Sequence, residues 1–225
     1  NKLGCESDFQ EVTIIVSGYP TPDVSHITVC ENSDKLSGTL KATATPSADN
    51  ASADFTLYWY ESKADGTMDE TTECSEIKLS PSIQKAADDG SKTKTYTYYV
   101  LQRLGTDKNK QSAAVPVRVT VNTNPKLTKL VTDPKCKGEK QKLSEMFDID
   151  IKGCEATYYD ANQGSMVTMQ SDVVTEAGLY EVKGWYIINE GTANEEKCSS
   201  QPEDLTVVFH ELDAAIVGSD RTCPG

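Results

Sequence analysis

The sequence predicts an all-β fold of two tandem immunoglobulin-like, antiparallel β-sandwich domains, with partial strands of neighbouring domains at both ends of the chain. Three observations lead to this prediction. Short segments alternate between apolar and polar residues with the period of two that β-strands show. Turn residues separate these segments, and a pattern with cysteines recurs along the chain. Helical periodicity is scarce and spans about one turn where it occurs, at 82–87 and 143–147.

A cysteine-led segment that ends in a β-branched strand occurs in related form three times. Cys5 and Cys198 each precede the threonine of such a strand by eight residues. In the middle copy, Ser112 occupies the place of the cysteine at the same spacing. A further cysteine follows each of these threonines 16 or 17 residues later, namely Cys30, Cys136 and Cys223. A repeat of this kind indicates one structural unit used several times.

The repeat and the polar or proline-rich stretches between its copies predict the domain boundaries. Residues 1–18 form the last strand of a preceding domain, and 19–122 form a complete domain. A second domain follows at 123–209, and 210–225 form the first strand of a following domain.

Aromatic residues in the predicted strands fall on both faces. Trp59 lies on one face of the strand at 55–60, whereas Tyr58 and Tyr60 lie on the other. One face of a sandwich strand must be core, so we expect Trp59 to be buried there, and Trp185 to be buried in the second domain. Tyr58 and Tyr60 are then outward-facing candidates for surface binding, because aromatic rings stack on the apolar faces of sugars.

Composition excludes several classes of function. The net charge of −13 argues against a nucleic-acid surface, since that affinity comes mainly from Lys and Arg. No apolar run approaches the roughly 20 residues of a membrane-spanning helix. The two histidines, His26 and His210, have no accompanying nucleophile pattern, and the motifs of hydrolases, zinc peptidases and nucleotide-binding loops are missing. We therefore expect no catalytic residues and no enzyme activity.

Calcium is the one cation that the sequence brings into consideration. Acidic clusters occur at 65–70, 88–90 and 203–204, and oxygen-rich loops bind hard cations. None of the clusters has the twelve-residue EF-hand spacing, and solvated acidic loops also keep an exported protein soluble. We expect no cofactor and no dedicated metal ligands.

The second predicted domain carries a set of short motifs. Its first part contains Cys136 followed by Lys-Gly, and a strand with Tyr-Tyr at 158–159 comes next. A Gly-Leu-Tyr strand then begins at Gly178, and Cys198 precedes a Leu-Thr-Val-Val strand. These motifs resemble the tandem immunoglobulin-like repeats of large secreted and cell-surface proteins of Bacteroidetes. The resemblance implies export through the type IX pathway and a role as a stalk, an adhesin or a gliding-motility filament. It carries over no catalytic residue.

The resemblance also implies a disulfide between Cys136 and Cys198, which would contribute about 3–4 kcal/mol in the loop-entropy account. Cys136 with Cys154 remains the alternative, because spacing alone does not decide connectivity. Cys30 and Cys74 are the cysteines inside the first domain boundaries, so we expect them to pair. The three remaining cysteines, Cys5, Cys154 and Cys223, are then expected to be unpaired or bonded to other domains or subunits.

Seven cysteines without a Cys-x-x-Cys motif indicate an oxidising, extracellular location. We expect a non-catalytic structural or adhesive module, a repeat segment of a long cell-surface stalk, adhesin or filament. The alternative is a carbohydrate-binding accessory domain of a secreted glycan-degrading protein. The expected partners are neighbouring domains of the same chain, other copies in a head-to-tail polymer, or a surface protein or glycan.

Overall fold

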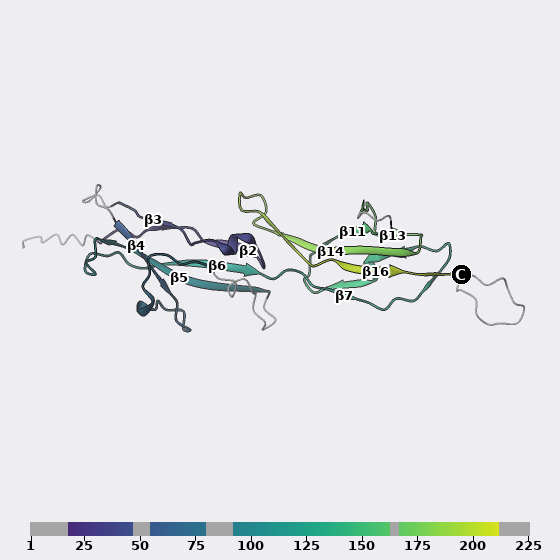
Figure 1. Ribbon diagram of the computed structural model, residues 1–225, viewed down its shortest axis with the longest axis horizontal. Helices are drawn as coiled ribbons and strands as arrows, with labels where there is room; N and C mark the ends of the chain where they lie inside the picture. The colour runs from purple at the N-terminus through teal and green to yellow at the C-terminus, as the bar shows by residue number, and fades with distance from the viewer. Residues whose placement is uncertain (1–17, 47–54, 80–91, 163–166, 212–225) are drawn as a thin grey trace, which may run out of the picture. The chain divides into compact units, whose positions relative to one another are not determined.

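The computed structural model describes residues 18–46, 55–79, 92–162 and 167–211. Within these ranges the regular structure consists of β-strands and three short 3-10 helices, η1 (Asp34–Ser37), η2 (Glu70–Thr72) and η4 (Leu143–Glu145) (Figure 1). The fold is all-β and of the immunoglobulin-like sandwich class, as the alternation predicts. One of the two expected helical turns forms as η4, and the other, at 82–87, lies outside the described residues.

The strands follow one another closely along the chain. In order they are β1 (Asp23–Val24), β2 (Ile27–Cys30), β3 (Ala42–Thr43), β4 (Phe55–Glu61), β5 (Thr93–Leu104), β6 (Val115–Asn122), β7 (Leu127–Lys129), β8 (Lys135–Cys136), β9 (Gln141–Lys142), β10 (Phe147–Ile149), β11 (Glu155–Asp160), β12 (Val167–Thr168), β13 (Val173–Val174), β14 (Gly178–Ile188), β15 (Glu196–Ser199), β16 (Glu203–Val207) and β17 (Phe209–His210).

Contacts between Cα atoms divide the chain into two compact units, each built from three segments. The first unit comprises 1–26, 39–77 and 97–117, and the second comprises 27–38, 78–96 and 118–225. Strands β5 and β6 pass from one unit into the other. The domain boundaries that the repeat predicts stay a prediction.

A four-stranded sheet has the order β2-β6-β5-β4. β4 and β5 are antiparallel and pair in register from Phe55 with Leu104 to Glu61 with Tyr98. The alternation buries Trp59 and Val100 on the core face, where both are 3% exposed or less. β2 pairs with β6 in parallel, as β17 does with β8, whereas the sequence predicts antiparallel sheets throughout. Alternation has the same period in both arrangements, so it does not report strand direction.

Strand β14 organises the sheet of the second unit. It pairs with β11 on one side and with β15 and β16 on the other, and β12 extends the sheet beyond β11 (Figure 1). Burial alternates from Leu179 to Gly184, with Tyr180 and Val182 on the core face and Leu179 on the outer face. The core contains Leu143, Met146, Phe147, Val174, Tyr180, Val182, Leu205 and Val207.

A second layer covers the core face of β14. β7 and β10 pair with each other, and their residues Leu127 and Ile149 pack against the core. Gly184 of β14 lies beneath them, where an added methyl group would be 3.3 Å from both side chains. The glycine therefore lets the two layers approach closely, as a sandwich requires.

Several sequence predictions fall outside the described residues. They are Cys5, Cys223, the acidic turn at 88–90, and nearly all of the terminal partial strands at 1–18 and 210–225.

Candidate functional site

A buried disulfide is the central feature of the second unit. Cys30, the last residue of β2, is bonded to Cys198 in β15, with the two Cα atoms 5.2 Å apart. The cysteines are separated by 168 residues in the sequence. They are 4% and 0% exposed, so the bond lies within packed protein.

Polar contacts hold the two strands together around the bond. The backbone N–H of Cys30 donates to Glu196 at 3.4 Å, and Lys35 forms an ion pair with the same carboxylate at 3.4 Å. The Asn189 side chain donates to the carbonyl oxygen of Thr28 at 3.0 Å. These contacts place the end of β2 against β15 independently of the covalent bond.

This connectivity corrects the predicted pairings. Cys30 does not pair with Cys74, which is a free thiol whose Sγ donates to the carbonyl oxygen of Trp59 at 3.5 Å. Cys136 is disulfide-bonded, but to neither of the expected partners, because Cys198 is bonded to Cys30 and Cys154 is free. Cys154 is thus unpaired, as expected. The prediction assumed that bonds close within a repeat, whereas the end of β2 lies beside β15 in the folded second unit.

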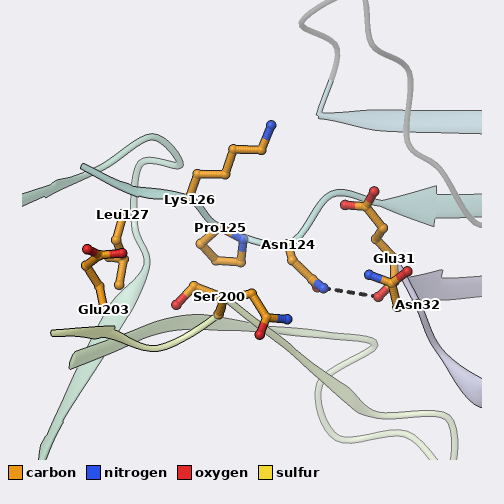
Figure 2. Close-up of a pocket in the computed structure, with 9 residues that line it drawn as sticks. Glu31, Asn32, Asn124, Pro125, Lys126, Leu127, Ser200 and Glu203 are labelled. Atoms are coloured by element: carbon orange, nitrogen blue, oxygen red, sulfur yellow. Dashed lines mark hydrogen bonds between the residues drawn. The ribbon is translucent and has the colours of Figure 1, made fainter. Parts of the chain in front are cut away.

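The second unit contains a pocket of about 370 Å³ (Figure 2). Its residues follow Cys30, Thr123 and Ser199 in the chain, namely Glu31, Asn32, Asn124, Pro125, Lys126, Leu127, Ser200, Gln201 and Glu203.

Two polar side chains of the pocket contact protein neighbours. The Asn124 side chain donates to the carbonyl oxygen of Glu31 at 3.1 Å (Figure 2). Lys129, outside the pocket, pairs with Glu203 at 2.8 Å. The side-chain oxygen of Asn124 is buried and accepts no hydrogen bond from the described residues. Sequence reasoning missed this pocket, apart from the acidic Glu203, because its residues are far apart in the chain.

The first unit contains a buried charge cluster that sequence reasoning also missed. Arg103 of β5 is 3% exposed and forms an ion pair with Glu73 at 3.1 Å. The guanidinium lies 4.0 Å from the centroid of the Tyr58 ring, and the Tyr60 hydroxyl donates to Glu73 at 2.6 Å. A cation–π contact and charge-assisted hydrogen bonds therefore surround a cation that would otherwise be costly to bury.

The cluster shifts the pKa values of two of its members. Hydrogen bonds from Arg103 and Tyr60 stabilise the charged carboxylate and lower the pKa of Glu73 to about 2. Burial, with the hydrogen bond to Glu73, raises the pKa of Tyr60 to about 12. Tyr60 is a hydroxyl donor and Glu73 an anion over the whole physiological range.

The arrangement corrects the predicted surface role of two tyrosines. Tyr58 and Tyr60 do lie on the strand face opposite Trp59, but Arg103 covers Tyr58, and Tyr60 is only 3% exposed. The reason is that the segment around Cys74 pairs with the edge of β4 and brings Glu73 over this face. Neither ring presents an open platform for a sugar.

The two tryptophans have different environments. Trp59 is buried, as predicted. Trp185 is only half-buried and lies on the outer face of β14, where Lys197 stands 3.6 Å from its ring centroid and its indole N–H donates to Thr157 at 2.9 Å. The expectation that Trp185 is a core residue is wrong, because the odd-numbered residues of β14 face outwards.

The predicted acidic clusters have local hydrogen-bond partners. Asp65 accepts from the backbone and hydroxyl of Thr67, and Asp69 does the same with Thr71. Among the described residues, no group of three or more His, Cys, Asp and Glu side chains could hold a metal ion. His26 and His210 are both exposed. No helix in the described part of the chain is long and apolar enough to cross a membrane.

Comparisons with known proteins identify no family. No family model matches the chain, and no curated protein does. Among solved structures, mouse cadherin-23 repeats EC22–24 are 16% identical, with 88% of this chain and 67% of that chain covered and a TM-score of 0.29. Titin A168–A169 is 13% identical, with 86% and 100% covered and a TM-score of 0.24.

Proposed function

We propose that this chain is a non-catalytic structural module, a repeat segment of a long extracellular stalk, adhesin or filament. The observation that carries the proposal is the buried Cys30–Cys198 disulfide. It joins β2 to β15 within the second unit, two strands that the predicted boundaries assign to successive repeats.

The same bond supports an extracellular location. Structural disulfides form and persist in oxidising compartments and are rare in the cytosol. A covalent link between distant segments also limits opening of the chain, which is the step that exposes backbone to proteases. The secreted Bacteroidetes surface proteins remain the predicted family.

The proposal is tested by proteolysis of the oxidised protein. We expect slow cleavage without reductant and at least tenfold faster cleavage of the Cys30→Ser/Cys198→Ser variant. The Cys74→Ser variant, which removes a free thiol, is the matched control and is expected to behave as wild type. Equal cleavage rates in the oxidised wild type and the double variant would contradict a stabilising link between β2 and β15.

Carbohydrate binding is the second candidate, and Trp185 is the residue that favours it. Its half-buried indole lies on the outer face of a sheet, although Lys197 covers the ring. Binding on a glycan array that is saturable and lost in Trp185→Ala, but kept in Tyr58→Ala, would replace the structural role with a glycan-binding one. We expect no such signal.

A head-to-tail polymer of this chain remains a proposal for its partners. Size-exclusion chromatography at several concentrations, without reductant, tests it directly. A polymer would elute earlier as the concentration rises, whereas a monomer at every concentration would remove this form of assembly.

A further inference from the structure

The Cys30–Cys198 bond also determines how a pulling force passes along the chain. Covalent bonds hold under loads that break the hydrogen bonds of a sheet. A force that enters before Cys30 and leaves after Cys198 can cross from one cysteine to the other through the two sulfur atoms. The chain at 31–197 then forms a side loop in which both ends are held together.

Few strands lie in the parts of the chain that bear the force, before Cys30 and after Cys198. On the N-terminal side they include β2, whose residues pair with β6 from Ile27 with Val119 to Cys30 with Asn122. On the C-terminal side they include β16, which pairs with β14 from Val207 with Gly178 to Glu203 with Val182. The strands β4, β5 and β14, which contain most of the pairing, lie inside the loop.

We propose that the Cys30–Cys198 disulfide is a mechanical bypass, which carries tension past the side loop and confines force-induced opening to the flanking strands. The inference rests on the proposed structural role, because it concerns a chain under load. The separation of 168 residues between the cysteines corresponds to about 600 Å of extended chain that tension cannot release while the bond is intact. Residues outside the loop can yield only about 200 Å.

Burial protects the bypass from reduction. A thiolate reductant must attack one sulfur atom, which forms a mixed disulfide and releases the other cysteine as a thiolate that takes up a proton. The cysteines are 4% and 0% exposed, so an attacking thiolate has no direct access in the folded protein. Peeling of β2 or β16 would open that access, and reduction should therefore be faster under load.

Single-molecule pulling from the two ends of the chain tests the proposal. All proteins in the experiment carry Cys136→Ser, because Cys136 forms another disulfide that would also withhold chain length. We expect the oxidised protein to extend by no more than about 200 Å, and Cys30→Ser/Cys198→Ser to release about 600 Å more.

A second arm keeps the test decisive if the double variant does not fold. A small thiol reductant added to the oxidised protein at constant force should produce a delayed extension of up to about 600 Å, and sooner at higher force. As a control, handles at the exposed Lys63 and Lys152, both inside the loop, should give about 300 Å whether or not the bond is present.

Two results would overturn the bypass. One is a release of more than about 200 Å from the ends of the oxidised protein, and the other is no reductant-dependent extension. Failure of the proposed function is separate from these, because glycan binding through Trp185 could coexist with an intact bypass.

Discussion

At the scale of single residues, the chain buries an arginine and provides it with partners. Arg103 is 3% exposed, and its charge is balanced by Glu73 and by the ring of Tyr58. Removing one partner of a buried ion pair lowers stability by more than the pair contributes, because the remaining charge is left buried without a partner. Glu73 is partly exposed, with a side-chain accessibility of 30%, which moderates this cost.

We expect Glu73→Gln to lower the free energy of unfolding by about 1–3 kcal/mol at pH 7, since it removes a charged hydrogen-bond acceptor from Arg103. Urea denaturation at neutral pH measures the loss. Glu70→Gln, which alters an exposed carboxylate in the same segment, is the control and should change stability by less than about 0.5 kcal/mol.

The same carboxylate predicts a pH dependence. The pKa of Glu73 is about 2 in the folded protein and 4.5 as a free group, so its contribution is complete above pH 4.5 and is lost as the pH falls towards 2. Wild type should therefore lose more stability than Glu73→Gln across this interval in urea titrations. Parallel losses in the two proteins would show that Arg103 and Tyr60 do not hold the Glu73 charge.

At the scale of elements, the two faces of the paired strands β14 and β16 differ in burial. Leu205 of β16 is 2% exposed and belongs to the core, whereas Leu179 of β14 is 39% exposed on the other face. We expect Leu205→Ala to cost about 2–5 kcal/mol, because it leaves a cavity, and Leu179→Ala to cost less than about 1 kcal/mol. Thermal or urea unfolding compares them, and equal costs would mean that the assigned faces are wrong.

The disulfide gives the second prediction at this scale. Cys30→Ser/Cys198→Ser should lower the free energy of unfolding by about 2–5 kcal/mol, since the unfolded chain regains the freedom of a long loop. Cys154→Ser should be nearly neutral, because that thiol is free and only half-buried. Urea unfolding without reductant measures both variants, and similar losses would argue against the bond.

Strand positions could be predicted from the sequence, but their partners could not. Alternation located β4, β5 and β14 and placed Trp59 in the core, because burial on one face leaves a local pattern. Trp185 was misplaced because the pattern does not say which of two alternating faces is inside. Arg103 and Glu73, like Cys30 and Cys198, meet only through tertiary structure, so no spacing rule reveals them.

At the scale of the whole molecule, the excess of acidic over basic residues determines how stability depends on salt. The net charge is −13, and mutual repulsion of like charges disfavours a compact state. We therefore expect the melting temperature to rise by a few degrees between low salt and about 0.5 M NaCl. At that salt concentration the Debye length is about 5 Å, so charges farther apart than this hardly repel each other. A fall in melting temperature would mean that local ion pairs outweigh the net repulsion.

Calcium should act no differently from other salts. Asp65 and Asp69 already accept hydrogen bonds from Thr67 and Thr71, which hold their turns. We expect equal melting temperatures in calcium and in chelator at matched ionic strength. A rise of several degrees at millimolar calcium would indicate a cation site that the described residues do not reveal.

The Cys30–Cys198 disulfide bears on how the predicted repeats could evolve. Cys30 belongs to one predicted repeat and Cys198 to the next, so neither repeat alone encodes the bond. Duplication or loss of a single repeat would separate the partners or leave a thiol exposed to oxidation. Lineages that lengthen or shorten this array should therefore conserve the order of adjacent repeats, or replace a cysteine as Ser112 does in the corresponding position here.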